Sequence, residues 1–110
     1  MVIICHCTDC QINSGTAFGV VVGVINGKFN LIKGELSFFQ KITDSSAKRD
    51  LGFCSNCGTR IFAKPGDHTN GTFGLRVGTV DQRANLLPKK QVFTKSALSW
   101  VPDISSIPKN

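Results

Sequence analysis

The chain has 110 residues, enough for one domain, and its 13 basic and 7 acidic residues give a formal charge of +6. No apolar run reaches the roughly 18 residues of a membrane span, and Met1–Ile4 is too short for the core of a signal peptide. We therefore expect a cytoplasmic protein with a single domain over residues 1–110 and no membrane partner. The basic residues are dispersed along the chain, which argues against a nucleic-acid partner.

The first half of the chain contains segments typical of β-strands. Residues 17–25 (AFGVVVGVI) are apolar and rich in β-branched side chains, as in a mostly buried strand. Asn26-Gly27 is a preferred pair for a two-residue hairpin turn, and residues 28–33 (KFNLIK) alternate polar and apolar, as a return strand does. Residues 36–42 (LSFFQKI) predict a further strand.

The second half continues in the same way. Residues 48–53 lead into a pair of cysteines and residues 59–63 lead out of it, so we predict a strand, a loop and another strand. Residues 72–77 (TFGLRV) and 91–95 (QVFTK) predict two more short strands.

Helical signals are weak throughout. No segment of 11 or more residues shows an apolar period of 3.6, whereas the 11 glycines and many short strands favour a sheet-based fold. We therefore predict an all-β fold of antiparallel sheets with short strands. Residues 99–110 contain two prolines and should be irregular, and we expect Trp100 to cover the edge of the core.

The five cysteines fall into two groups, each with a C-x-x-C spacing: Cys5, Cys7 and Cys10, then Cys54 and Cys57. Five is an odd number, so internal disulfides would leave one thiol over. A C-x-x-C loop points two sulfurs at one tetrahedral ion, as in zinc sites. Buried apolar cysteines and a redox pair are the alternatives, but no βαβ pattern supports the redox reading. The spacing therefore favours Zn²⁺ as a cofactor, and we expect Gly58, after the second group, to turn with a positive φ.

The first group is unusually dense. Residues 5–10 (CHCTDC) offer three thiolates, and three protein ligands with one open position are the arrangement of a catalytic zinc. In an extended segment His6 points away from Cys5 and Cys7. We therefore do not expect His6 to bind the metal, although acid–base work by its ring stays open.

These motifs resemble a known family. Residues 5–10, followed by Ser14-Gly15, are similar to the C-H-C-x-x-C-[RQ]-x-x-S-G signature of the glutathione-dependent formaldehyde-activating (Gfa-like, centromere protein V) family. Residues 53–59 (FCSNCGT) resemble its F-C-x-x-C-G-T motif, and residues 78–81 (GTVD) its G-T-[LV]-D segment. A late proline and tryptophan also match, at Pro88 and Trp100.

The resemblance implies a zinc-binding β-tent fold and a carbon–sulfur lyase activity on a glutathione–aldehyde adduct such as S-hydroxymethylglutathione. By this analogy Cys5, Cys7 and Cys10 hold a catalytic zinc, and Cys54 and Cys57 belong to a structural zinc. Addition of a thiol to an aldehyde needs a thiolate and a polarised carbonyl, and an open zinc site supplies both. A basic surface would also help to collect anionic glutathione.

One part of the family pattern is expected to be missing. Family members carry a G-x-C-x-C-G segment upstream whose two cysteines complete the structural zinc, and the printed sequence starts at Met1. Cys54 and Cys57 alone do not close a tetrahedral site. The second group is then metal-free, or shares one composite site with the first, or takes ligands from a partner chain. An exposed sheet edge would favour a homodimer, which light scattering would detect.

Two functions from different classes follow. The first is a zinc-dependent carbon–sulfur lyase-like enzyme whose catalytic residues are Cys5, Cys7 and Cys10. The alternative is a non-catalytic, zinc-stabilised binding module in which the metal only holds the fold together. Full coordination of the metal by four cysteines would favour the module.

Overall fold

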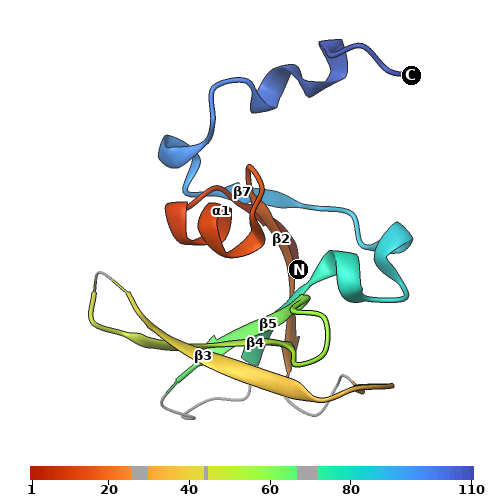
Figure 1. Cartoon of the computed structure of the whole chain (residues 1–110). Helices are drawn as coiled ribbons and strands as arrows, with labels where there is room; N and C mark the ends of the chain where they lie inside the picture. Colours follow the sequence, from red (N-terminus) through yellow and green to blue (C-terminus); the bar gives the residue numbers. More distant parts are fainter. Residues whose placement is uncertain (26–29, 44, 67–71) are drawn as a thin grey trace.

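The computed structural model describes residues 1–25, 30–43, 45–66 and 72–110. Within these residues, seven strands form one sheet, accompanied by one α-helix and four short 3-10 helices (Figure 1). The strands are β1 (Val2–Cys5), β2 (Gly19–Ile25), β3 (Leu36–Ile42), β4 (Lys48–Cys54), β5 (Arg60–Pro65), β6 (Thr72–Arg76) and β7 (Lys90–Val92). The helices are α1 (Thr8–Ser14), η1 (Val77–Thr79), η2 (Arg83–Asn85), η3 (Thr94–Ser96) and η4 (Val101–Ser106).

The strand order is β3-β4-β5-β6-β2-β1-β7, and each neighbouring pair is antiparallel except β1 and β7, which run parallel. The all-β class is therefore confirmed. The parallel pair departs from the antiparallel sheets expected, because a long segment between β6 and β7 carries the chain back to the edge of β1 (Figure 1).

The return strand predicted over residues 28–33 is wrong in its described part. Residues 30–33 lie in no strand. The partners of β2 are instead β1 on one side and β6 on the other, so both of its hydrogen-bonding edges are occupied. No edge is left for a return strand beside β2, and the predicted Asn26-Gly27 turn lies outside the described residues.

The other predicted strands are confirmed as β2, β3, β4, β5, β6 and β7, with small shifts at the ends of the first five. The strand predicted over residues 91–95 is shorter, because β7 ends at Val92 and Thr94–Ser96 forms η3. Among the strands and the α-helix, β1 and α1 were not predicted from the sequence. Both are short, at 4 and 7 residues, so neither develops a readable period.

The buried core lies on one face of the sheet and is formed by Phe62, Phe73 and Leu75. The ring centroids of Phe62 and Phe73 are 5.3 Å apart, which is a favourable aromatic contact. Gly52 allows this packing, because a Cβ at that position would lie 2.6 Å from the Phe62 ring. The core therefore joins β5 and β6 and depends on a glycine in β4.

The C-terminal segment lies apart from β3, β4 and β5 in Figure 1 and contains η4 within the region predicted to be irregular. Trp100 is 49% exposed and is not a buried core residue, contrary to the expectation that it covers the core edge. Neither η4 nor any other helix of the described residues has the length and apolar character required to cross a membrane.

Candidate metal centre

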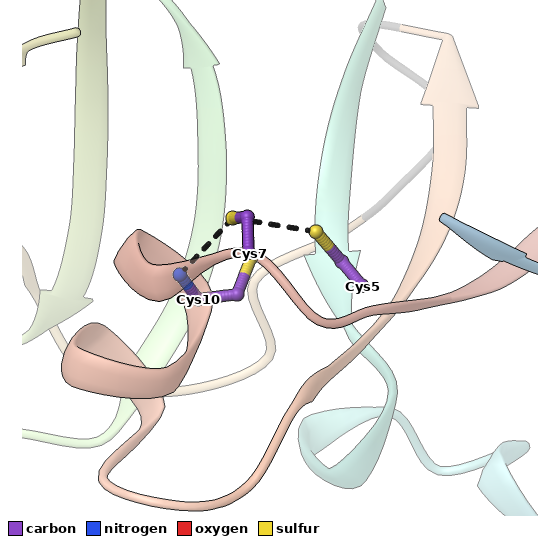
Figure 2. Close-up of side chains that lie close together, drawn as sticks. All are labelled: Cys5, Cys7 and Cys10. Carbon is purple, nitrogen blue, oxygen red and sulfur yellow. Dashed lines mark hydrogen bonds between the residues drawn. The ribbon is translucent and has the colours of Figure 1, made fainter. Parts of the chain in front are cut away.

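Three cysteine sulfurs meet where β1 ends and α1 begins (Figure 2). Cys5 is the last residue of β1, Cys7 immediately precedes α1, and Cys10 lies in the first turn of that helix. The three Sγ atoms lie within 4.8 Å of one another, and those of Cys5 and Cys7 are 3.4 Å apart. Zn–S bonds of about 2.3 Å in a tetrahedron place sulfurs about 3.8 Å apart. This cysteine cluster (Cys5, Cys7 and Cys10) therefore fits a metal ion.

The helix α1 holds two of these cysteines in place. Cys7 is its N-cap: the residue has an extended backbone, and its Sγ accepts a hydrogen bond from the backbone N of Cys10 at 3.3 Å. At the other end Gly15 adopts φ +69°, which closes the helix with its N–H bonded to the Gln11 and Ile12 carbonyls. Both ends of this short helix are thus fixed, and its first turn places Cys7 and Cys10 on one side.

His6 anchors the same segment from the opposite side. It is 1% exposed, its Nε2 lies 2.7 Å from Gln91 Oε1 in β7, and its ring packs edge-on against Phe18 at 5.6 Å between centroids. The Gln11 side chain donates to the His6 carbonyl at 2.9 Å. His6 is not in the group that could hold a metal, as its place in an extended segment predicted. Neither Gln11 nor Gln91 was identified from the sequence, because each meets His6 only in the fold.

Burial disfavours the thiolate form of the cysteine cluster unless a cation is bound there. Burial of Cys5 raises the pKa of its thiol from 9.0 to about 12. Burial likewise raises the pKa of Cys10, although the positive charge of Arg76 acts in the opposite direction. At neutral pH these groups are therefore thiols unless a positive ion stabilises the thiolates, and a bound metal does so.

Two arginines lie near the cluster with no acidic partner among the described residues, whose one ion pair joins Lys41 to Asp9 at 3.2 Å. The Nε and Nη2 atoms of Arg60 and the Nε and Nη1 atoms of Arg76 are buried without a hydrogen-bond partner. Arg60 retains one long contact, from Nη1 to the Asn13 carbonyl at 3.5 Å. Sequence reasoning missed these arginines, because nothing in their local pattern distinguishes them from ordinary strand residues.

The second cysteine pair lies at the turn between β4 and β5. Cys54 ends β4, Cys57 is exposed, and Gly58 has φ +76°, as predicted. A hydrogen bond from the Thr59 hydroxyl, 3.1 Å from Cys57 Sγ, is the main cause that lowers the pKa of Cys57. Among the described residues no third cysteine, histidine or acidic residue joins this pair, and it does not share one ligand set with the cysteine cluster. Metal binding by Cys54 and Cys57 stays a prediction.

A cavity of about 920 Å³ lies on the face of the sheet that carries the core, and the core residue Leu75 is part of its lining. Its lining includes Val22 and Val24 of β2, together with Thr79 and Asp81 of the predicted G-T-V-D segment. Cys5 pairs with Gly19 of β2, and residues at odd and even positions of a strand point to opposite faces. The cavity and the cysteine cluster are therefore separate features.

The fold and the site together define a small all-β protein with a three-cysteine centre able to hold a metal ion. The model of the glutathione-dependent formaldehyde-activating enzyme family matches residues 1–96, and the chain belongs to this family. The match spans both cysteine groups and the G-T-V-D segment, so the resemblance seen in the sequence is confirmed. No curated protein matches the chain.

Proposed function

We propose that the protein is a zinc-dependent enzyme of the carbon–sulfur lyase type. Its substrate would be the adduct of glutathione, or a similar thiol, with an aldehyde such as formaldehyde. The observation that carries this proposal is a group of three sulfurs with no fourth cysteine, histidine or acidic ligand among the described residues. Three protein ligands leave one position for a substrate atom. Membership of the family supports the thiol and aldehyde as the substrate class.

The reaction is a reversible addition. In the forward direction the thiol sulfur forms a bond to the aldehyde carbon, the C=O double bond opens, and the thiol proton ends on the oxygen; the lyase direction reverses each change. Zinc bound at the cysteine cluster would supply a Lewis acid and lower the pKa of a bound thiol. The chain itself positions the ligands, through the capped α1 and the anchored His6.

A zinc-stabilised binding module is the second candidate. It is favoured by the position of the cluster, because Cys5 belongs to β1 whereas Cys7 and Cys10 belong to the start of α1. A metal there would tie a strand to the adjoining helix and contribute directly to folding. In this case metal removal would unfold the protein, and thiols would not reach the metal.

We also propose that Cys54 and Cys57 bind metal with further ligands from outside the described residues or from a second chain. Free thiols in both groups suit a reducing compartment such as the cytosol.

A homodimer is supported by β3, an edge strand of the sheet on which Phe39 and Ile42 are exposed. Light scattering at micromolar concentration tests the dimer, and a single monomeric species would contradict it.

The deciding experiment measures zinc per chain by elemental analysis in the wild type, in Cys5→Ser and in Cys54→Ser. Zinc lost with Cys5→Ser and kept with Cys54→Ser supports an open site at the cysteine cluster. The same proteins are then incubated with glutathione and ¹³C-formaldehyde, and adduct formation and exchange are followed by NMR. An exchange rate in the wild type equal to that in Cys5→Ser would count against the enzyme and in favour of the module.

A further inference from the structure

The charges of Arg60 and Arg76 are not balanced by an acidic side chain among the described residues. An arginine side chain stays charged in proteins, and burial of an unpaired charge is strongly unfavourable. Four guanidinium nitrogens of these two residues are nevertheless buried and lack a hydrogen-bond partner. A fold that buries two such groups side by side needs negative charge close to them.

Carboxylates of the described residues do not provide this charge. Asp9 pairs with Lys41 at 3.2 Å. Asp50, the buried acidic residue, accepts a hydrogen bond from the Gln40 side chain at 3.2 Å. Neither Arg60 nor Arg76 contributes to an ion pair among the described residues.

The cysteine cluster lies close enough to the arginines to supply this negative charge. The Arg76 guanidinium covers Gly19, where an added Cβ would overlap its Nη1 atom and lie 3.4 Å from the Cβ of Cys10. Arg60 Nη1 lies 3.5 Å from the carbonyl oxygen of Asn13, in the same helix α1 that carries Cys10. Burial, and then the charge of Arg76, lower the pKa of Arg60, whereas Cys10 acts in the opposite direction. The two guanidinium groups therefore lie close to the part of the chain that carries Cys10.

The formal charge of the metal site depends on whether its fourth ligand is neutral or anionic. A divalent ion with three thiolates carries +2 − 3 = −1, and a neutral fourth ligand leaves this value unchanged. A thiolate as the fourth ligand makes it −2, which the two guanidinium groups balance to zero. The two arginines are thus matched in charge to a site that holds four sulfurs, three from this chain and one from outside it.

We propose that Arg60 and Arg76 are counter-charges that make the metal centre select an anionic thiolate, rather than a neutral ligand, at its open position. This inference rests on the proposed function, because it assumes a metal on the cysteine cluster. It assigns the two arginines a positioning role. The group they favour is the ionised sulfur of the thiol substrate, not the carboxylates that a thiol such as glutathione also carries.

The test uses cobalt(II) in place of zinc, because its thiolate absorption bands report each ligand directly. Two titrants are added to the cobalt-loaded protein: 2-mercaptoethanol, which is charged only at sulfur, and imidazole, which is neutral. The variants are R60Q and R76Q, with R76K to retain the charge. R83Q is the matched control, because Arg83 is an exposed arginine of η2 away from the cluster.

We expect R60Q and R76Q each to weaken thiol binding by about 10- to 100-fold, the range known for residues that support metal ligands. Imidazole binding should change far less, R76K should recover most of the thiol affinity, and R83Q should match the wild type. Equal losses for both titrants would overturn the inference. A loss seen with glutathione but not with 2-mercaptoethanol would also overturn it, because the arginines would then bind carboxylates.

Failure of the proposed function gives a different result. If the wild type shows no cobalt–thiolate bands, or keeps them in Cys5→Ser, the proposed metal centre is wrong.

Thermal unfolding of the metal-free variants tests whether the arginines serve the fold instead of the metal site. R60Q and R76Q should be at least as stable as the wild type without metal, because each loses an unpaired buried charge. If both fail to fold without metal while R76K folds, the arginines serve the fold and the inference is overturned.

Discussion

The sulfur of Cys7 accepts a hydrogen bond from the backbone N of Cys10 at 3.3 Å, so one atom both caps α1 and belongs to the group that could hold a metal. The two roles require different chemistry. A hydroxyl caps a helix well, whereas a zinc site of this kind needs a thiolate. Substitutions at this one position can therefore separate the stability of the helix from metal binding.

We predict that Cys7→Ser loses most of the bound zinc but unfolds in urea, as the metal-free protein, close to the wild type. Cys7→Ala should lose the zinc and also about 1 kcal/mol of unfolding free energy, the usual cost of a lost N-cap. Elemental analysis and urea titrations of chelator-treated protein provide the two readouts. Equal stabilities of the Ser and Ala variants would show that the cap contributes nothing.

Gly19 provides a second prediction, because the Arg76 side chain occupies the space beside its Cα. Gly19→Ala should displace the guanidinium group and destabilise the protein by about 1–3 kcal/mol, as overpacking does. Gly23→Ala, in the same strand, is the matched control. The nearest atom to its added Cβ is the Met1 carbonyl oxygen at 3.9 Å, so its effect should stay within about 0.5 kcal/mol. Indistinguishable urea midpoints for the two variants would contradict the packing described at Gly19.

Cys57 should be the most reactive thiol of the metal-free protein and Cys5 one of the least. The Thr59 hydroxyl stabilises the Cys57 thiolate and lowers its pKa, whereas burial raises that of Cys5 to about 12. At pH 8 the thiolate fraction, and hence the rate of alkylation by iodoacetamide, is larger at Cys57. Peptide mass spectrometry over a time course measures both rates.

Thr59→Val removes the hydroxyl and should slow alkylation at Cys57 severalfold, whereas Thr94→Val, in the exposed helix η3, should leave it unchanged. Faster labelling of Cys5 than of Cys57 in the wild type would be incompatible with the burial of Cys5.

The cysteine cluster was predictable because its three cysteines lie within residues 5–10, where spacing alone brings them together. The strands from β2 to β7 were likewise readable from local alternation and β-branched runs. Residues 28–33 show the limit of this reasoning. Their alternation predicted a half-buried return strand, but residues 30–33 are exposed and lie in no strand, because β1 and β6 occupy both edges of β2.

The partners of the cluster could not be predicted for a similar reason. Arg76 reaches Gly19 across the pairing of β2 with β6, and Gln91 reaches His6 across the parallel pairing of β1 with β7. These contacts join residues far apart in the chain. Only the register of the sheet, which a single sequence does not reveal, brings them to the site.

The stability of the metal-free protein should fall as the pH rises above 9, and Cys5 provides the reason. In the unfolded chain this thiol loses its proton near its ordinary pKa of 9.0, whereas in the fold it keeps the proton up to about 12. Between these values the folded state binds more protons than the unfolded state, so the unfolding free energy decreases with increasing pH. Urea titrations at pH 8 and pH 10, with chelator and reductant present, measure the fall. Cys5→Ala removes the titrating group and should show a smaller decrease, with Cys57→Ala as the exposed control. A Cys5→Ala variant that loses as much stability as the wild type over this range would assign the pH dependence to other groups.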